Sequence, residues 1–334
     1  MKKAAVVILN WNGQKLLEQF LPSLVKYSPD ASIYVADNSS DDLSVELLRV
    51  HFPMVTVIRN VANFGFAKGY NEALRFVEEE IYVLINSDVE VTQGWLDPVL
   101  ALFELEPNTA IVQPKILSYK DRGTFEYAGA GGGYIDRFGY PFCRGRIFDS
   151  LEPDNGQYDD TADIFWASGA CLFIRKEVFR ELRGFDADFF AHMEEIDLCW
   201  RAAHLNLRTR YCGASTVYHV GGATLDAANP HKTYLNFRNS LFMLVKNVPQ
   251  GDLLPILLMR LVLDGIAGAR FLVTSGPAHT GAVIRAHFAF YKRMFIFFER
   301  RPLRITKKYF AVRSIAWQYF VKKRRHFGNL LTIV

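Results

Sequence analysis

The chain has 334 residues, half of them hydrophobic and 22% charged, a composition typical of a globular protein and not of an intrinsically disordered one. This length predicts one large domain or two modest ones. The net charge of +4 is mild, but thirteen basic residues and a single acid follow residue 284, so this segment carries +12 and the remainder −8.

The four cysteines form no C-x-x-C pair and have apolar or aromatic neighbours, so we expect free core thiols in a reducing compartment: Cys143, Cys171, Cys199 and Cys212. The apolar run AAVVIL follows Lys2 and Lys3 but lacks a small-residue cleavage pattern. We therefore interpret it as a buried strand and not as a signal peptide, and we expect a cytoplasmic protein.

The first hundred residues alternate between strand-like and helix-like segments. Short, nearly continuous apolar runs typical of strands buried on both faces occupy 4–10, 32–37, 55–60 and 81–86. Apolar residues at helical spacing occupy 14–27, 42–51 and 66–79. The alternation predicts a parallel sheet with crossover helices, followed by a helix over 93–105 and a strand over 110–117.

Polar side chains stand where these four strands end. They are Asn10, Asn12, Asp37, Asn38, Asn60, Asn63, Asn86 and Asp88. Asn and Asp also favour ordinary turns. However, ligands of such sheets bind at the carboxyl ends of the strands, so four ends on one edge favour a binding site over four unrelated turns.

The pattern changes after the strand over 110–117. Residues 123–160 are rich in glycine and aromatic residues without a phosphate-binding motif, and we expect a hairpin or mobile loop beside the site. A strand over 170–176 and a helix containing Asp197 and Arg201 follow, and the four-residue spacing of these two predicts a surface ion pair. Residues 207–219 are extended and end at His219.

From residue 231 onward the chain is helical, aromatic and basic in character. The segment 253–275 approaches the length of a membrane span, but Arg260, Asp264 and Arg270 interrupt it. Each charge at a bilayer centre costs about 2.5 to 3.5 kcal/mol, so we expect a helix that lies on the membrane or packs on protein. The aromatic and basic tail predicts contact with an anionic membrane surface and not with nucleic acid.

Six segments, in this order, resemble the motifs of the family 2 inverting glycosyltransferases, in particular the rhamnosyltransferase-like branch. They are VVILNWNG, DNSSDD (37–42), NFGFAKGYN (63–71), INSDVEV (85–91), GFDADFFAHMEEIDLCWR (184–201) and VYHVGG (217–222). The resemblance implies a GT-A fold, an α/β Rossmann-like mixed sheet flanked by helices. We therefore expect a glycosyltransferase domain over 1–240 and a basic, aromatic, helical membrane-associating extension over 241–334.

The family also implies a nucleoside-diphosphate sugar donor, bound by residues of these motifs: Asn10, Asp37, Asn63, Gly65, Lys68, Asn86 and Asp88. At the end of the second strand, Asp37 can accept a hydrogen bond from a base or a ribose hydroxyl. It can equally cap the helix that DNSSDD opens. Gly65 permits close backbone approach and Lys68 supplies a cation, although a glycine-containing helix start has the same pattern.

A divalent metal, Mg²⁺ or Mn²⁺, is implied as well. INSDVEV occupies the place of the family's Asp-x-Asp metal motif, and Asn86 stands where the first acid often occurs, which leaves Asp88 as the expected ligand. His219 is the expected second ligand by motif position. Few protein ligands suffice when phosphate and water complete the shell, and an imidazole ligand favours Mn²⁺.

The resemblance places the catalytic acids at Glu194 and Glu195, where family members usually have Glu-Asp. Glu195 occupies the position of the base, which removes a proton from the acceptor hydroxyl in a single displacement at the anomeric carbon. We expect the helix dipole to keep it ionised and Glu194 to support loop or acceptor contacts. Acids in a first helical turn also simply stabilise the helix.

The predicted function is transfer of a sugar, with rhamnose as the first expectation, to a saccharide or lipid-linked acceptor in cell-surface polysaccharide synthesis. We expect the protein on the inner face of the plasma membrane; its oligomeric state is not indicated. The altered metal and acid motifs leave open a catalytically silent nucleotide-sugar-binding or membrane scaffold protein. A nicotinamide-dependent oxidoreductase is less well supported, because NWNGQK follows the first strand in place of G-x-G-x-x-G.

Overall fold

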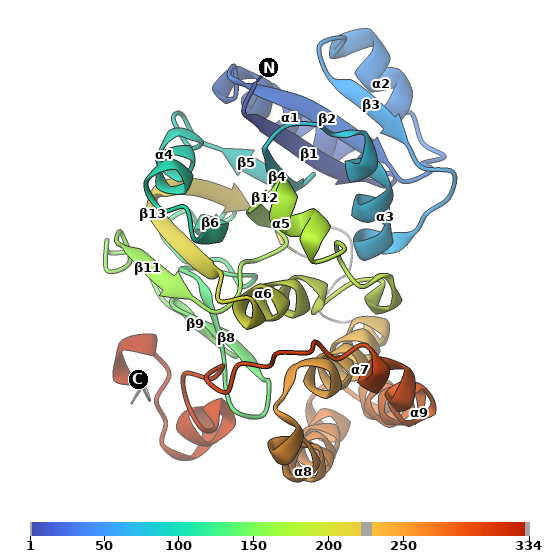
Figure 1. Ribbon diagram of the computed structural model, residues 1–334, viewed down its shortest axis with the longest axis vertical. Coiled ribbons are helices and arrows are strands. Elements are labelled where there is room, and N and C mark those ends of the chain that lie inside the picture. The colour runs from blue at the N-terminus through green and yellow to red at the C-terminus, as the bar shows by residue number, and fades with distance from the viewer. Residues whose placement is uncertain (1, 222–228, 331–334) are drawn as a thin grey trace.

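A mixed β-sheet flanked by helices forms the body of the protein, as Figure 1 shows for the computed structural model, which describes residues 2–221 and 229–330. The strand order is β11-β13-β6-β12-β4-β1-β2-β3, and β5 pairs with β13. The strands are β1 (Ala4–Asn10), β2 (Ala31–Asp37), β3 (Thr56–Arg59), β4 (Ile81–Asn86), β5 (Val89–Val91), β6 (Thr109–Ser118), β11 (Thr161–Ile164), β12 (Cys171–Arg175) and β13 (Arg208–His219). The expected α/β mixed sheet is confirmed.

Six helices accompany this sheet before the C-terminal helical layer. They are α1 (Gln14–Tyr27), α2 (Ser44–His51), α3 (Gly65–Ala73), α4 (Asp97–Leu105), α5 (Lys176–Glu181) and α6 (Glu194–His204). Buried leucines on one face of α1 pack on the sheet, as the helical spacing of its apolar residues predicts. All four cysteines are free and buried, as expected.

The predicted parallel pairing holds in the first half of the sheet. β1 pairs in parallel with β2 and β4, and β2 pairs in parallel with β3. In this register Asn10 lies opposite Asp37, and Leu9 lies opposite Asn86. The polar strand ends therefore meet at one edge. Beyond β4 the pairing is mixed, because β12 runs antiparallel to both β4 and β6 while β13 pairs in parallel with β6.

The third helix is shorter than the predicted segment 66–79. It ends at Ala73, and a 3₁₀ turn over Leu74–Phe76 follows. The buried hydroxyl of Tyr82 donates hydrogen bonds to the carbonyl oxygens of Leu74 and Val77, at 3.4 and 3.0 Å. This side chain of β4 satisfies carbonyl groups that a longer helix would have bonded internally.

The glycine- and aromatic-rich segment contains the expected hairpin as part of a small antiparallel sheet. Its strands are β7 (Gly133–Ile135), β8 (Pro141–Cys143), β9 (Arg146–Ile147) and β10 (Ser150–Leu151). Gly145 turns the chain between β8 and β9 with a φ of +86°, and a Cβ there would lie 2.6 Å from the ring of Phe125. Glycine is therefore required at this turn.

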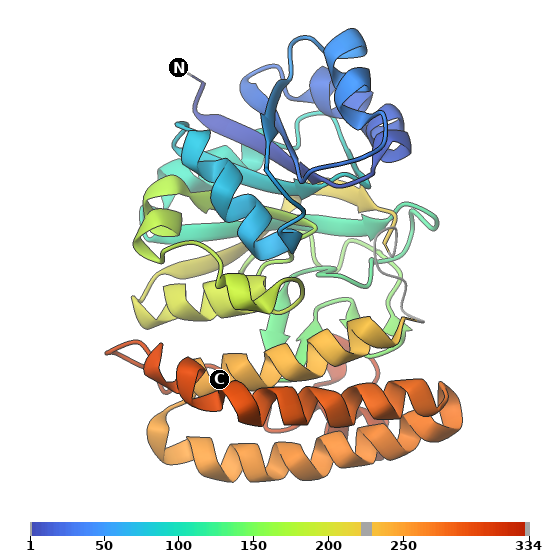
Figure 2. The ribbon, with the colours of Figure 1, turned by 90° about the vertical axis from the view of Figure 1, so that its right-hand side faces the viewer.

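Three C-terminal helices form a layer beside α6, with α8 farthest from the sheet (Figure 2). They are α7 (Pro230–Asn247), α8 (Gln250–Thr274) and α9 (Pro277–Glu299). The predicted domain boundary after residue 240 falls inside α7. Phe242 of α7 and Phe297 of α9 stack with ring centroids 3.7 Å apart, and both belong to the same hydrophobic cluster as Trp200 of α6.

The charges that interrupt the apolar sequence of α8 have an internal role. Arg260 and Asp264 are buried and form an ion pair at 3.1 Å, and the hydroxyl of Tyr140 donates to Asp264 at 2.6 Å. Within residues 2–221 and 229–330, no helix is long and apolar enough to cross a membrane.

Candidate active site

The ends of β1 and β2 form the first part of the site. The buried Asn10 amide donates to the carboxylate of Asp37 at 3.4 Å, and Asp37 accepts from the backbone N–H of Ser40 at 3.2 Å. The interpretation of Asp37 as a helix cap is wrong, because α2 begins at Ser44, whose N–H bonds to Asp42 at 3.0 Å. The Oδ1 atom of Asn10 is buried without a donor in the described chain, so a ligand N–H or O–H could satisfy it.

The start of α3 forms the second part. Asn63 accepts hydrogen bonds from the Asn38 amide and from the Gly65 N–H, both at 3.0 Å. Gly65 has a φ of +71°, and a Cβ there would lie 2.5 Å from the ring of Phe190. This glycine lets α3 approach the loop that leads to α6. Lys68 is exposed on α3, and its ammonium group lies 4.0 Å from the ring centroid of Phe64.

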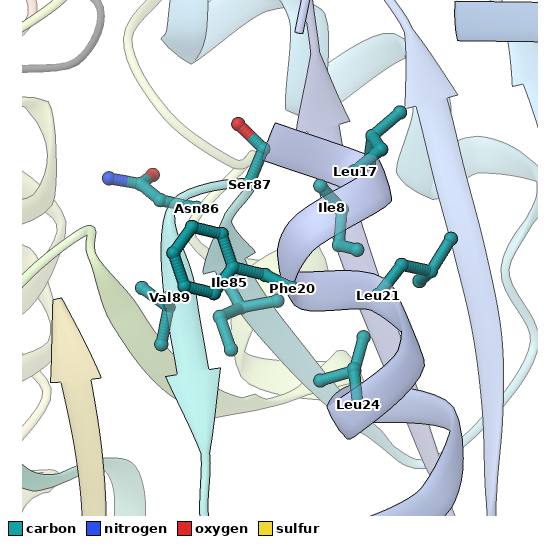
Figure 3. Close-up of a pocket in the computed structure, with 9 residues that line it drawn as sticks. All are labelled: Ile8, Leu17, Phe20, Leu21, Leu24, Ile85, Asn86, Ser87 and Val89. Carbon is teal, nitrogen blue, oxygen red and sulfur yellow. The ribbon is translucent and has the colours of Figure 1, made fainter. Parts of the chain in front are cut away.

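The predicted metal ligands meet at the third part of the site. β5 pairs with β13 so that His219 lies opposite Val89, next to Asp88. Nε2 of His219 is 3.1 Å from Oδ1 of Asp88, and both side chains are buried. Asn86 lies 3.5 Å from the same nitrogen. In Figure 3 the polar ends of Asn86 and Ser87 point away from the apolar side chains of α1. Gly222, the last residue of the VYHVGG motif, lies outside the described residues.

A buried acid that the sequence did not reveal lies on the other side of His219. Oε2 of Glu126 is 3.2 Å from Nδ1 of His219, and Glu126 also accepts from the backbone N–H of Ala128. Burial lowers the pKa of His219, but its contacts with Asp88 and Glu126 outweigh burial and raise this pKa to about 10. Glu126 belongs to the glycine- and aromatic-rich segment, where no motif marks it.

The donor atoms of this site suit a metal ion that also binds substrate. The described residues contain no cluster of three or more His, Cys, Asp or Glu side chains arranged for a metal. Asp88 and His219 supply one carboxylate and one imidazole, which leaves coordination positions for phosphate and water. A carboxylate at the second ring nitrogen, as Glu126 provides, commonly orients a histidine ligand. The residues present therefore fit a divalent ion.

Glu194 and Glu195 begin α6 after a strained loop, with φ values of 66°, 70° and 73° at Phe190, His192 and Met193. One carboxylate oxygen of each acid is buried without a hydrogen-bond donor in the described chain. Burial raises the pKa of Glu195 to about 7, and burial together with the Glu195 charge raises that of Glu194 well above its usual range. The expectation that the helix dipole keeps Glu195 fully ionised is therefore wrong, because burial outweighs the dipole.

This strained loop is held by helices from two distant parts of the chain. The amide of Asn239 on α7 donates to the carbonyl oxygens of Phe189, Ala191 and His192 at 2.8 to 2.9 Å. On the other side, the N–H groups at the start of α3 donate to the carbonyl oxygen of Phe190 at 2.8 and 3.2 Å. The position of the two acids therefore depends on both α3 and α7.

We expect Asn239→Ala to lower both stability and turnover. Unsatisfied buried carbonyl groups cost about 1 to 3 kcal/mol, so the melting temperature should fall by several degrees. Turnover should fall further than stability explains, because the loop is free to leave its strained conformation. The control for lost stability is Ser240→Ala, a change at the neighbouring position that removes the acceptor of a hydrogen bond from Arg260. Equal turnover in the two variants, measured while both are folded, would contradict a positioning role for Asn239.

Asp197, one turn along α6, differs from its predicted role. The expected ion pair with Arg201 is present at 2.8 Å, but Asp197 is fully buried and not on the surface. It also accepts from Lys246 at 2.8 Å and from Asn247 at 2.9 Å, both on α7. Despite burial, these partners lower the pKa of Asp197 to about 2. The pair therefore fastens α6 to the C-terminal layer.

Comparison with curated proteins finds several glycosyltransferases at low sequence identity. The N-acetylglucosaminyl-diphospho-decaprenol L-rhamnosyltransferase of Mycobacterium tuberculosis is 25% identical over 238 residues, which cover 64% of this chain and 75% of that protein. The rhamnosyltransferase WbbL of Escherichia coli is 23% identical over 223 residues, 64% of this chain and 82% of the relative. A low-salt glycan biosynthesis hexosyltransferase, Agl10 of Haloferax volcanii, is 23% identical over 251 residues, 70% of this chain and 73% of the relative.

Solved structures share the fold at low sequence identity. GalNAc-T7 with UDP, GalNAc and Mn²⁺ aligns with a TM-score of 0.58 at 17% identity, over 75% of this chain but only about half, 49%, of its own. The mannosyltransferase PcManGT of Pyrobaculum calidifontis, in complex with GDP-Man and Mn²⁺, aligns with a TM-score of 0.52 at 16% identity, over 89% of this chain and 83% of its own. These neighbours support the GT-A fold.

The family assignment rests on a match to more than half of the chain. The model of glycosyl transferase family 2 matches residues 5–183, which include β1 from Ala5 onward, the polar strand ends and Asp88. The chain therefore belongs to glycosyl transferase family 2 and has the GT-A fold.

Proposed function

We propose that this protein is a metal-dependent, inverting glycosyltransferase that moves a sugar from a nucleoside diphosphate to a saccharide or lipid-linked saccharide. The observation that carries the proposal is the contact of Asp88 with His219 at the sheet edge where β1, β2 and β4 end. A metal bound there faces the edge at which sheets of this kind bind nucleotides.

Each part of the edge has a role in donor binding. The buried Asn10 and Asp37 present an unsatisfied acceptor and a carboxylate, which suit the N–H groups of a base or the hydroxyls of a ribose. Asn63 and Gly65 fix the start of α3, and Lys68, three residues after Gly65, offers an exposed cation for the donor. Asn86 lies beside the metal pair. A divalent ion held by Asp88 and His219 would neutralise the charge that develops on the departing diphosphate.

Glu195 is the proposed base. A carboxylate accepts a proton best when its pKa lies near the working pH, and burial places the pKa of Glu195 at about 7. The acceptor hydroxyl would donate its proton to this carboxylate as its oxygen attacks the anomeric carbon from the face opposite the departing phosphate. Burial and the charge of Glu195 raise the pKa of Glu194 well above its usual range, and in its protonated form Glu194 would donate a hydrogen bond to the acceptor or the loop.

The donor sugar and the acceptor are proposed from the named relatives. Two of them are rhamnosyltransferases, and the name of one specifies a diphospho-decaprenol acceptor. We propose rhamnose as the first sugar to test and a lipid-linked saccharide as the first acceptor, in cell-surface polysaccharide synthesis. The solved neighbours are complexes with UDP or with GDP-Man, so several bases belong in the same test.

A thermal-shift panel of nucleotide sugars, with Mg²⁺, with Mn²⁺ and with chelator, tests the donor proposal. A ligand that prefers the folded state raises the melting temperature, by about 2.7 kcal/mol of stability at a hundredfold excess over its dissociation constant. We expect a metal-dependent rise for one nucleotide class, followed by product formation with an acceptor. Binding without turnover on any acceptor would instead indicate the catalytically silent alternative, which Asn86 and the Glu-Glu sequence had suggested.

The outer face of the C-terminal layer supports the proposal that the protein binds to the inner face of the plasma membrane. Exposed apolar side chains follow one face of α8 and one face of α9: Leu254, Leu258, Val262, Ile266, Ile284, Phe288 and Phe295. The buried Arg260 and Asp264 lie on the opposite side of α8. Basic residues are interspersed with the apolar ones on α9 and after it. Two of them, Arg293 and Arg300, form ion pairs with acids that precede the strained loop, namely Asp186 and Asp188. This combination suits the surface of an anionic membrane.

We expect Phe288→Ser/Phe295→Ser to weaken binding to anionic vesicles. Both rings are 72% exposed in the unbound protein, and burying each in lipid is worth about 1.5 to 3 kcal/mol, so binding should fall at least about tenfold. Flotation with anionic and neutral vesicles measures this. Leu43→Ser/Met54→Ser removes exposed apolar groups from the opposite end of the molecule and should have no effect. Equal flotation on both vesicle types would contradict the electrostatic contribution.

A further inference from the structure

Arg146, at the start of β9, is buried, and Glu126, the acid that acts on its charge, forms no ion pair with it. The side chain of Arg146 is 6% exposed, and it forms no ion pair within the part of the chain that the structure describes. Its Nε is buried without an acceptor, and its printed hydrogen bond runs from Nη2 to the sulfur of Cys143 at 3.6 Å. A buried charge in this state is costly, so its presence indicates a compensating group that binds to the protein.

Other buried cations of this fold show how such groups are usually compensated. Arg144, two residues earlier and equally buried, pairs with Asp160 at 2.9 Å and donates to the carbonyl oxygen of Gly131 at 2.8 Å. Carboxylate partners also accompany other buried basic side chains, namely Lys115, Arg210, Lys246 and Arg260. Arg144 and Arg210 also each have a buried guanidinium nitrogen without an acceptor, so the missing carboxylate partner is what distinguishes Arg146 from its control Arg144.

Arg146 contacts Tyr127, the sequence neighbour of the acid that lies beside His219. Its guanidinium lies 4.4 Å from the ring centroid of Tyr127, and Tyr127 directly follows Glu126, which contacts His219. Burial lowers the pKa of Arg146, but Cys143, Tyr127 and Glu126 outweigh burial, so the side chain remains charged. An anion that binds beside Tyr127 and Glu126 would complete this site.

We propose that Arg146 binds a phosphate oxygen of a substrate diphosphate, either that of the nucleotide sugar or that of a lipid-linked acceptor. A planar guanidinium matches phosphate geometry, and a phosphate would supply the acceptors that Nε lacks. This inference rests on the proposed function, because both diphosphates belong to that reaction.

The experiment compares Arg146→Met with Arg144→Met in the full-length protein. Without ligand, Arg146→Met should keep or raise the melting temperature, because it removes a buried charge that has no ion-pair partner. Arg144→Met should lower the melting temperature, because it leaves the buried carbonyl oxygen of Gly131 without its donor. Isothermal titration then uses three probes: inorganic pyrophosphate with chelator, UDP or dTDP with Mn²⁺, and farnesyl diphosphate. Arg146→Met should weaken at least one of the diphosphate probes about tenfold or more, as loss of a charge-assisted hydrogen bond predicts, and Arg144→Met should not.

The pattern across probes identifies the source of the phosphate. A loss confined to the nucleotides assigns Arg146 to the donor, and a loss confined to farnesyl diphosphate assigns it to the acceptor. Wild-type affinity of Arg146→Met for all three probes would overturn the inference while leaving the proposed function intact. If the wild-type protein binds no nucleotide in the presence of metal, the proposed function fails. The farnesyl diphosphate and pyrophosphate titrations then still test Arg146, because wild-type affinity of Arg146→Met for both of these probes would overturn its role in phosphate binding.

Discussion

Replacing Glu195 by glutamine is expected to lower turnover by about two to four orders of magnitude, the usual contribution of a general base. Glutamine keeps the shape of the side chain but cannot accept the proton of the acceptor hydroxyl. Donor binding should change little, because Asp88, His219 and the strand ends remain intact. Turnover with the natural acceptor and donor affinity by titration, measured side by side, give the two quantities.

The pH profile of turnover distinguishes a base from a merely structural acid. Burial raises the pKa of Glu195 to about 7, so the basic form is lost as the pH falls through this value. Turnover of the wild-type protein should therefore rise with pH up to about 7 and level off above it, and the residual turnover of Glu195→Gln should not follow this curve. A wild-type profile that stays flat from pH 5 to 8 would contradict the assignment.

Two further variants fix which of the adjacent acids acts. Glu195→Asp should retain far more activity than Glu195→Gln, because a carboxylate that can accept the proton remains. Glu194→Gln should stay active if Glu194 acts as a protonated hydrogen-bond donor. Because the pKa of Glu194 is raised, its charged form destabilises the fold as pH rises above the normal carboxyl range, so Glu194→Gln should also raise the melting temperature more at pH 8 than at pH 5. An inactive Glu194→Gln beside an active Glu195→Gln would reverse the roles.

The sequence predicted the sheet edge because the signal there is local. Nearly continuous apolar runs identify strands buried on both faces, and the residue after each run is read directly from the sequence. Parallel pairing then brings strand ends together without further information, and Asn10 does lie opposite Asp37. The contact of Asp88 with His219 could not be predicted from a local pattern, because 131 positions separate the two residues. Only the order of the family motifs connected them.

The remaining features depend on packing that no local pattern reports. Glu126 contacts His219 and Asn239 contacts Phe189 across distant segments, and both have an ordinary sequence context, as does the buried Arg146. The burial of Asp197 also depends on packing between distant segments. Its spacing from Arg201 predicted the ion pair, but the sequence did not show that α7, which carries Lys246, packs on α6 and covers Asp197. The raised pKa of Glu195 likewise follows from burial, which outweighs the helix dipole that the sequence indicated.

Replacing Asp88 by alanine is expected to abolish metal-dependent donor binding. Loss of an outer-sphere partner typically weakens a metal site about 10- to 100-fold, so loss of a direct ligand should exceed about 100-fold. Mn²⁺ affinity, followed by electron paramagnetic resonance of the free ion, and the melting-temperature rise with nucleotide plus Mn²⁺ both measure the effect. Chelator should remove the rise in the wild-type protein and change nothing in the variant.

Two companion variants separate this effect from a change in folding. Asp88→Ala leaves the buried His219 with Glu126 as its acidic neighbour, so Asp88→Asn, which keeps the side-chain volume, guards against a loss of structure. Glu90→Gln removes a carboxylate two residues away on β5, where it pairs with Arg122 at 2.9 Å, and should leave Mn²⁺ affinity unchanged. Wild-type Mn²⁺ affinity in folded Asp88→Asn and Asp88→Ala would remove Asp88 from the metal site. The ion would then have to bind elsewhere, because His219 alone supplies too few ligands to hold it.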